Sequence, residues 1–121
     1  MKLNHLDLQV ADVPRSVGLF ERLLGFRLES NRASEAIAIL TDGEGFTLVL
    51  QRRKSETDRY PEAFHFGFLV NDPETVRSFH AKARDEDLAS VSDVIENGRG
   101  VLVYCRTKDG LLFEVSSHRV R

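Results

Sequence analysis

Polar and apolar side chains alternate along the first ten residues, MKLNHLDLQV. The apolar positions are Leu6, Leu8 and Val10, and the polar positions between them are His5, Asp7 and Gln9. A period of two residues predicts a β-strand with one buried and one polar face. We therefore expect a histidine and an aspartate to share the polar face of the strand that opens the fold.

The chain repeats this pattern near its middle. The segment NHLDLQVADVPRSVGLF, which starts at Asn4, aligns without a gap on FHFGFLVNDPETVRSFH, which starts at Phe64. In this alignment His5 meets His65, and the offset is close to half of the chain. An internal repeat of this length indicates two similar modules.

A helix is predicted after the first strand of each copy. Asp12 and Asp72 are suited to cap these helices, and Pro14 and Pro73 suit their first turns. Apolar residues at helical spacing then form one stripe in each copy. The first stripe is Val13, Val17, Phe20 and Leu24, ending at Gly25, and the second is Val76, Phe79 and Ala83.

Three further strand-like runs follow each helix. They cover about residues 26–30, 36–40 and 46–51 in the first half, and about residues 90–95, 101–106 and 111–116 in the second. Asp-Gly and Asn-Gly pairs between runs predict hairpin turns. The sequence therefore predicts an α+β domain over residues 1–121, built from two tandem βαβββ modules. Module one covers about residues 1–52, the polar linker about 53–62, and module two about 63–121.

Composition excludes several classes of protein. With 121 residues, 41% hydrophobic and 30% charged, the chain suits one globular domain and is too short for two independent ones. The net charge of -2 gives no basic footprint for nucleic acid. The N-terminus has no signal-peptide pattern, and no apolar stretch approaches the length that spans a membrane. We expect a cytoplasmic protein that binds neither nucleic acid nor a membrane.

The single cysteine, Cys105, lies in the apolar stretch VLVYC. No internal disulfide can form, and a reducing compartment fits. A catalytic thiol and a buried strand thiol both fit the sequence, and the buried thiol is the commoner case.

The paired βαβββ halves, the opening HLDLQVADVPRSVGLFERLLGF and the closing DGLLFEVSS resemble the vicinal oxygen chelate superfamily. This family includes glyoxalase I, bleomycin-resistance proteins, extradiol dioxygenases and fosfomycin-modifying thiol transferases. The resemblance spans almost the whole chain. It implies that two modules assemble eight strands into a half-open cup, that a metal ion sits on the cup floor, and that the protein is a homodimer.

The resemblance also implies a set of metal ligands: His5 from the first strand, His65 from the fifth and Glu114 from the last. Period two independently turns each of these side chains away from the apolar face of its strand. Two imidazoles and one carboxylate leave coordination positions open for substrate or water, as a catalytic metal requires. The set suits iron, manganese or zinc. His80 and His118 are read as surface or core residues.

The sequence departs from the family at a fourth ligand position. The family often places a glutamate on the fourth strand, but here that strand reads FTLVLQ. Thr47, Val49 and Gln51 share one face of it, and Val49 is the best match to the missing ligand. A neutral amide is a poor substitute for a carboxylate, so Gln51 is not counted as a ligand.

Three further residues are candidates for catalysis or substrate binding beside the metal. Asp7 lies about 6 to 7 Å along the strand from His5, too far to share one ion but near enough to act as a base or to support a ligand. A solvated carboxylate at the rim is an equally good interpretation. Tyr104 and Arg106 share one face of their strand, and they would orient a substrate if that face is the inner one. If Cys105 points inward instead, they are structural.

These features predict a metal-dependent enzyme that acts on a small oxygen-chelating molecule. The resemblance leaves the reaction open between a lyase, a dioxygenase and a thiol transferase, although the missing fourth-strand glutamate weighs against glyoxalase-type proton transfer. Asp7 adds negative charge that disfavours a dianionic substrate. The alternative is a metal-free protein of the bleomycin-resistance type, which sequesters a drug or metabolite in an apolar, aromatic groove.

Overall fold

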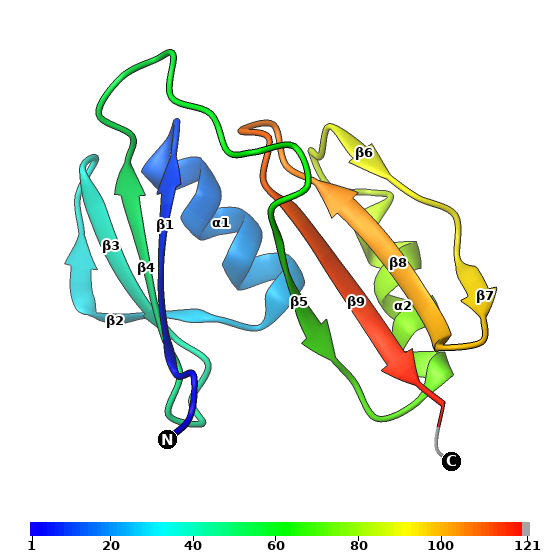
Figure 1. Ribbon diagram of the computed structural model, residues 1–121. Coiled ribbons are helices and arrows are strands. Elements are labelled where there is room, and N and C mark those ends of the chain that lie inside the picture. The colour runs from blue at the N-terminus through cyan, green and yellow to red at the C-terminus, as the bar shows by residue number, and fades with distance from the viewer. Residues whose placement is uncertain (120–121) are drawn as a thin grey trace. The chain divides into compact units, whose positions relative to one another are not determined.

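The computed structural model describes residues 1–119, apart from the side chains of residues 30–33 (Figure 1). The chain forms two compact units, Met1–Asp58 and Arg59–Arg121, which divide within the polar segment predicted as a linker. Among the residues that the structure describes, each unit contains one helix and one β-sheet. No helix among the described residues is long and apolar enough to cross a membrane.

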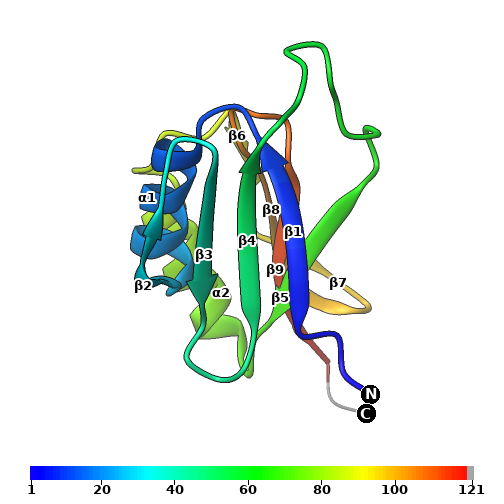
Figure 2. The same cartoon turned by 90° about the vertical axis from the view of Figure 1, so that its left-hand side faces the viewer.

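The first unit is a four-stranded sheet with a helix against it. Its elements are β1 (His5–Val10), α1 (Val13–Leu24), β2 (Arg27–Ala33), β3 (Ile37–Thr41) and β4 (Thr47–Arg52). The strands lie in the order β1-β4-β3-β2. Figure 2 shows β1, β4 and β3 side by side. The pair β1 and β4 is parallel, whereas the other pairs are antiparallel, so the first and last strands of the unit are neighbours.

The first helix has the caps that the sequence predicts. A carboxylate oxygen of Asp12 accepts a hydrogen bond from the backbone N–H of Arg15 at 3.0 Å. The helix ends at Leu24, and its C-cap is Gly25, whose φ of 75° lies in the left-handed region that glycine adopts without strain. Leu8 and Val10 of β1 are buried, whereas His5, Asp7 and Gln9 are exposed. The polar face of β1 therefore points away from the core, as the alternation predicts.

The second unit repeats this plan with one strand divided. Its elements are β5 (His65–Leu69), α2 (Pro73–Ala83), β6 (Ser90–Val91), β7 (Ile95–Asn97), β8 (Gly100–Arg106) and β9 (Leu112–His118). The order is β5-β9-β8-β6, with β7 also paired to β8, and β5 runs parallel to β9. The core forms around the ring of Phe113, which contacts Phe66, Phe68 and, from α2, Phe79.

The run predicted at residues 90–95 is two short strands because of Ser92. The backbone N–H of Ser92 donates to Tyr104 O at 2.8 Å, but the backbone N–H of Tyr104 donates to the Ser92 hydroxyl at 2.9 Å. The side chain thus takes the place of a backbone acceptor, which interrupts the ladder. The chain rejoins β8 at Ile95, opposite Leu102. Both pieces pair with β8, so together they take the place of the single strand that the βαβββ pattern predicts.

Candidate metal and substrate site

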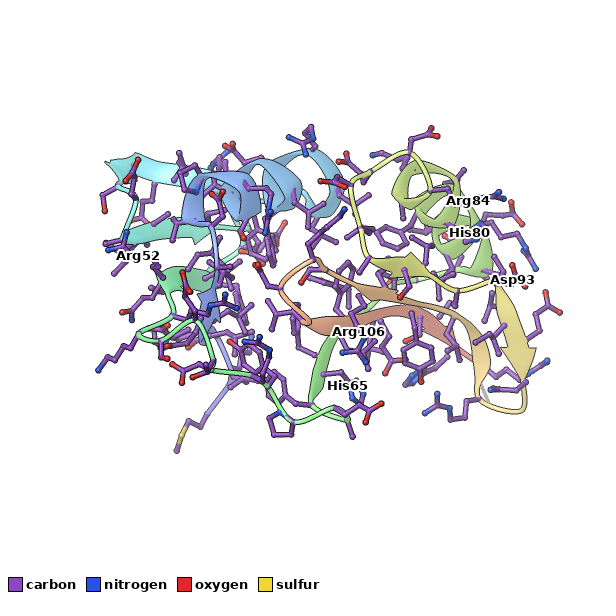
Figure 3. The ribbon with its side chains drawn as sticks, turned by 90° about the horizontal axis from the view of Figure 1, so that it is seen from above. Arg52, His65, His80, Arg84, Asp93 and Arg106 are labelled. Atoms are coloured by element: carbon purple, nitrogen blue, oxygen red, sulfur yellow. The ribbon has the colours of Figure 1, made fainter. Side chains whose placement is uncertain are left out.

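His65 and Glu114 lie together on the open face of the second sheet. Phe66 and Phe68 turn toward the aromatic core, so His65 and Gly67 point to the opposite face of β5. On β9, Phe113 and Val115 are buried and Glu114 points the same way as His65. In Figure 3, His65 lies on the side of the sheet away from α2, which carries His80. His65 Nε2 is 3.6 Å from Glu114 Oε1.

Gly67 makes this approach possible. It lies directly opposite Glu114 in the parallel pairing of β5 and β9. A Cβ at Gly67 would stand 2.8 Å from Glu114 Cγ and 3.1 Å from its carbonyl oxygen. Since both distances are shorter than ordinary van der Waals contact, the absence of a side chain lets Glu114 lean over β5 toward His65.

The backbone sets the tautomer of His65. Its Nδ1 is 3.0 Å from the carbonyl oxygen of Ala63. A carbonyl can only accept, so Nδ1 carries the proton of this hydrogen bond. In the neutral imidazole the lone pair is then on Nε2, the atom that faces Glu114. An imidazole held in this way by a carbonyl is the usual arrangement of a metal-ligating histidine.

The two side chains fit a divalent ion as two of its ligands. Ligand atoms about 2.0 to 2.2 Å from a zinc ion lie roughly 3 to 3.5 Å from one another. The 3.6 Å between Nε2 and Oε1 is close to this spacing. An imidazole nitrogen and a carboxylate oxygen suit zinc, iron and manganese alike. In neither unit, however, do the described residues gather three His, Cys, Asp or Glu side chains.

Tyr104 and Arg106 occupy the same face as this pair. Tyr104 lies opposite Glu114, and its ring is edge-on to the His65 ring at a centroid distance of 6.4 Å. Arg106 lies opposite Leu112, and its guanidinium donates to the carbonyl oxygens of Gly110 at 2.9 Å and Glu62 at 3.4 Å. From the sequence alone, this face of the strand could be either the inner face of the cup or the face that packs in the core. It is the face that carries the predicted ligands.

Cys105 points into the core instead. Its side chain is fully buried, and burial raises the pKa of the thiol to about 12. A thiol that stays protonated is a poor nucleophile. The structure therefore favours the buried strand thiol over the catalytic thiol.

In the first unit, His5 and Asp7 lie on the exposed face of β1, opposite Thr47 and Val49 of β4. Val49, the match to the fourth ligand position, is an almost fully buried apolar residue. Gln51 has a role that sequence reasoning missed, since its Nε2 donates to Asp7 Oδ2 at 2.5 Å. The only sign of this contact in the sequence is that both side chains lie on the polar faces of their strands. From the sequence alone, Gln51 is considered only as a possible metal ligand.

The first unit also has an open, mostly apolar groove on its helix side. Its volume is about 350 Å³. The residues that line it are Val13, Pro14, Val17, Leu28, Ser34 and Glu35. The Ser34 hydroxyl accepts hydrogen bonds from the backbone N–H groups of two following residues, so it closes the β2–β3 turn. Neither histidine of the predicted ligand set contributes to this groove.

Comparison with known proteins points to one family and to several functions within it. The sequence profile of the Glyoxalase/Bleomycin resistance protein/Dioxygenase superfamily matches residues 2–115. No curated protein matches the chain.

Solved structures with the same fold carry different functional descriptions. A possible glyoxalase from Bacillus cereus is 27% identical, with 96% of this chain and 98% of that chain covered and a TM-score of 0.81. The bleomycin-binding protein of Streptomyces verticillus, solved with copper(II)-bleomycin, is 18% identical, with 98% of each chain covered and a TM-score of 0.69. The fosfomycin resistance protein FosX from Listeria monocytogenes, solved with Mn(II) and sulfate, is 16% identical, with 98% and 91% covered and a TM-score of 0.78.

Proposed function

Because the chain belongs to the Glyoxalase/Bleomycin resistance protein/Dioxygenase superfamily, we propose that it is a metal-dependent enzyme for a small, oxygen-chelating substrate. The proposed ligands of the divalent ion are His5, His65 and Glu114. The observation that carries the proposal is the pairing of His65 Nε2, with its lone pair free of the backbone, and Glu114 Oε1 at 3.6 Å. The proposal adds His5 as the third ligand, because the internal repeat gives it the same position in module one as His65 in module two.

The ion would supply Lewis-acid chemistry by polarising an oxygen of the substrate. The chain's own residues divide the remaining work. His65 and Glu114 present a nitrogen and an oxygen donor on one rigid sheet face. Tyr104, opposite Glu114, would contact the bound molecule and orient it. Asp7 would accept a proton through Oδ1, since its Oδ2 is held by Gln51.

Within this class the candidate reactions are those of a lyase, a dioxygenase and a thiol transferase. The apolar Val49 in place of a fourth-strand carboxylate favours the reactions that use two histidines and one carboxylate. Iron would direct assays to catechols, zinc to 2-oxoaldehyde adducts, and manganese to thiol transfer. The metal found in the protein therefore decides which assays come first.

Metal content tests the proposal directly. Protein purified without chelators should contain near-stoichiometric iron, manganese or zinc by elemental analysis. His5→Ala, His65→Ala and Glu114→Gln should each lose it, whereas His118→Ala, at the exposed end of β9, should keep it. No metal in the wild-type protein, even after incubation with each ion, would remove the proposed function.

The family resemblance also leads us to propose a homodimer, and complementation tests whether its subunits share the site. His5→Ala and His65→Ala chains would each lack a ligand when pure. If the site is shared between two subunits, a mixed dimer has one site that combines the intact His5 of one chain with the intact His65 of the other. Metal binding would then return in the mixture. A site built within each subunit would stay empty in every combination. Sedimentation of the wild-type protein gives its oligomeric state independently.

A metal-free binding protein is the second candidate, and one observation favours it. The rings of Tyr60 and Phe64 stack at a centroid distance of 5.1 Å, and Phe64 is 38% exposed. Such a pair offers a flat apolar surface directly before His65 on the chain. Calorimetry with bleomycin and with copper(II)-bleomycin would test this function. Phe64→Ala should weaken binding if the aromatic pair holds the drug, and the His65→Ala variant should not.

A further inference from the structure

One side chain connects the starts of the two strands that carry His65 and Glu114. Arg106 ends β8, and the pairing register places it in one row with Leu112 of β9 and His65 of β5. Both Arg106 and His65 lie on the sheet face away from α2 (Figure 3). From this position the guanidinium reaches two loops, one before each ligand-bearing strand.

The first loop is the turn between β8 and β9. Arg106 Nη1 donates to Gly110 O at 2.9 Å. Hydrogen bonds from Gly110 N to Thr107 O and from Thr107 N to Leu111 O close the same turn. The start of β9 is therefore fixed to the end of β8, which sets the position from which Glu114 extends.

The second loop is the turn that enters β5. The backbone N–H of Phe64 donates to Pro61 O at 3.0 Å and closes this turn. Within it, Glu62 O accepts from Arg106 Nη2 at 3.4 Å, and the next carbonyl, Ala63 O, accepts from His65 Nδ1 at 3.0 Å. The peptide group that Arg106 holds is thus adjacent to the one that orients the imidazole.

We propose that Arg106 is a positioning residue for the metal ligands rather than a group that binds substrate. Its two bonds to backbone carbonyls fix the turn whose next carbonyl keeps the His65 lone pair on Nε2. A guanidinium suits this task because its rigid fork donates in two directions, whereas a lysine ammonium has no such fork. The inference rests on the proposed function, because it takes His65 to be a metal ligand.

The orientation of His65 can be measured without metal. Long-range 1H–15N correlation spectra distinguish the Nδ1–H tautomer, the Nε2–H tautomer and the doubly protonated ring from one another. The wild-type protein should show the Nδ1–H form. Arg106→Met should show a mixture that includes the Nε2–H form, and Arg106→Lys should lie between the two.

Mn(II) affinity gives a second measurement on the same variants. Loss of a group that supports a metal ligand typically weakens metal binding 10- to 100-fold, so Arg106→Met should weaken it by about tenfold. Arg77→Met is the matched control. Arg77 also makes two side-chain bonds, to Glu74 and Glu96, but on α2 and β7. Its loss should leave the His65 tautomer and Mn(II) binding unchanged.

The outcomes separate the two proposals. A folded Arg106→Met or Arg106→Lys protein that keeps His65 wholly in the Nδ1–H form would overturn the positioning role, and so would an equal change in Arg77→Met. If the wild-type protein binds no divalent ion, the proposed function fails, but the tautomer spectra still decide the role of Arg106. If Arg106→Met does not fold, Arg106→Lys carries the test.

Discussion

Gly67 and Glu114 face each other across the parallel pair of β5 and β9 at a distance that leaves no room for a side chain on Gly67. A Cβ there would come within 2.8 Å of Glu114 Cγ and 3.1 Å of Glu114 O. The side chain could move away, but the backbone oxygen could not do so without a shift of β9. The position of Glu114 over β5 therefore depends on a residue that carries no functional group.

Gly67→Ala tests this dependence. The extra methyl group should push Glu114 away from His65 and destabilise the protein by about 1 to 3 kcal/mol, as overpacking usually does. Bound metal should fall together with stability. Gly98→Ala is the control, because a Cβ at Gly98 would meet nothing within 4 Å. Urea unfolding and metal analysis of the two variants give the comparison, and an unchanged metal content in Gly67→Ala would contradict the prediction.

The contact between Gln51 and Asp7 should appear as a coupling energy. The amide donates to the carboxylate at 2.5 Å between neighbouring parallel strands, on an exposed face. A hydrogen bond to a charged group contributes more than a neutral one, and exposure to water reduces the gain. We expect a coupling of about 1 kcal/mol at neutral pH in a double-mutant cycle of Asp7→Ala and Gln51→Ala. Additive effects of the two changes would show that the contact does not persist in solution.

The Cys105 thiol should be inert in the folded protein. Its pKa is raised by burial from 9.0 to about 12, so at pH 8 iodoacetamide should modify the urea-unfolded chain and leave the folded protein unmodified. The folded state holds the thiol proton more tightly than the unfolded state. This difference contributes stability that is fully present below about pH 9 and is lost as the pH rises toward about 12.

The pH dependence can be assigned to this thiol by comparison with Cys105→Ala. Other groups titrate in the same alkaline range, but they are present in both proteins. The wild-type protein should lose more of its unfolding free energy between about pH 9 and pH 12 than the variant does. Parallel declines in the two proteins would contradict the assignment.

Ser92 should stabilise the sheet through its hydroxyl. Ser92→Ala would leave the partly buried N–H of Tyr104 without its acceptor, at a cost of about 1 to 3 kcal/mol. Amide hydrogen exchange at Tyr104 should accelerate in this variant, whereas Ser92→Thr should retain slow exchange. Ser90→Ala, at an exposed position of β6, serves as the control. Slow exchange at Tyr104 in Ser92→Ala would show that another group satisfies this amide.

Much of the fold followed from local patterns. Alternation separated His5 and Asp7 from Leu8 and Val10, and the caps at Asp12 and Asp72 marked both helices. Such patterns depend on neighbours in the chain, so one sequence suffices to read them. The same alternation predicted that His65 and Glu114 would point to the same face.

The contacts that orient these side chains could not be predicted in the same way. Gln51 meets Asp7, and Arg106 meets Glu62, across 44 positions of sequence in each case. Such meetings depend on strand register and side-chain reach, and a period of two fixes neither. Ser92 was read as an ordinary strand residue because its hydroxyl acts on a backbone group of another strand. The candidate metal ligands thus follow from the local pattern and the family resemblance, whereas the contacts that support them depend on strand register.

The parallel pairing of β5 with β9 also fixes when the ligand pair can form. A ribosome releases the chain from its N-terminus, so His65 emerges well before the strand that carries Glu114. Because β9 lies between β5 and β8 in the sheet, the second unit cannot close until its last strand has been synthesised. A chain that stops short of residue 112 keeps His65 but lacks its partner. An ion can therefore bind to this pair only after synthesis of the chain has passed Glu114.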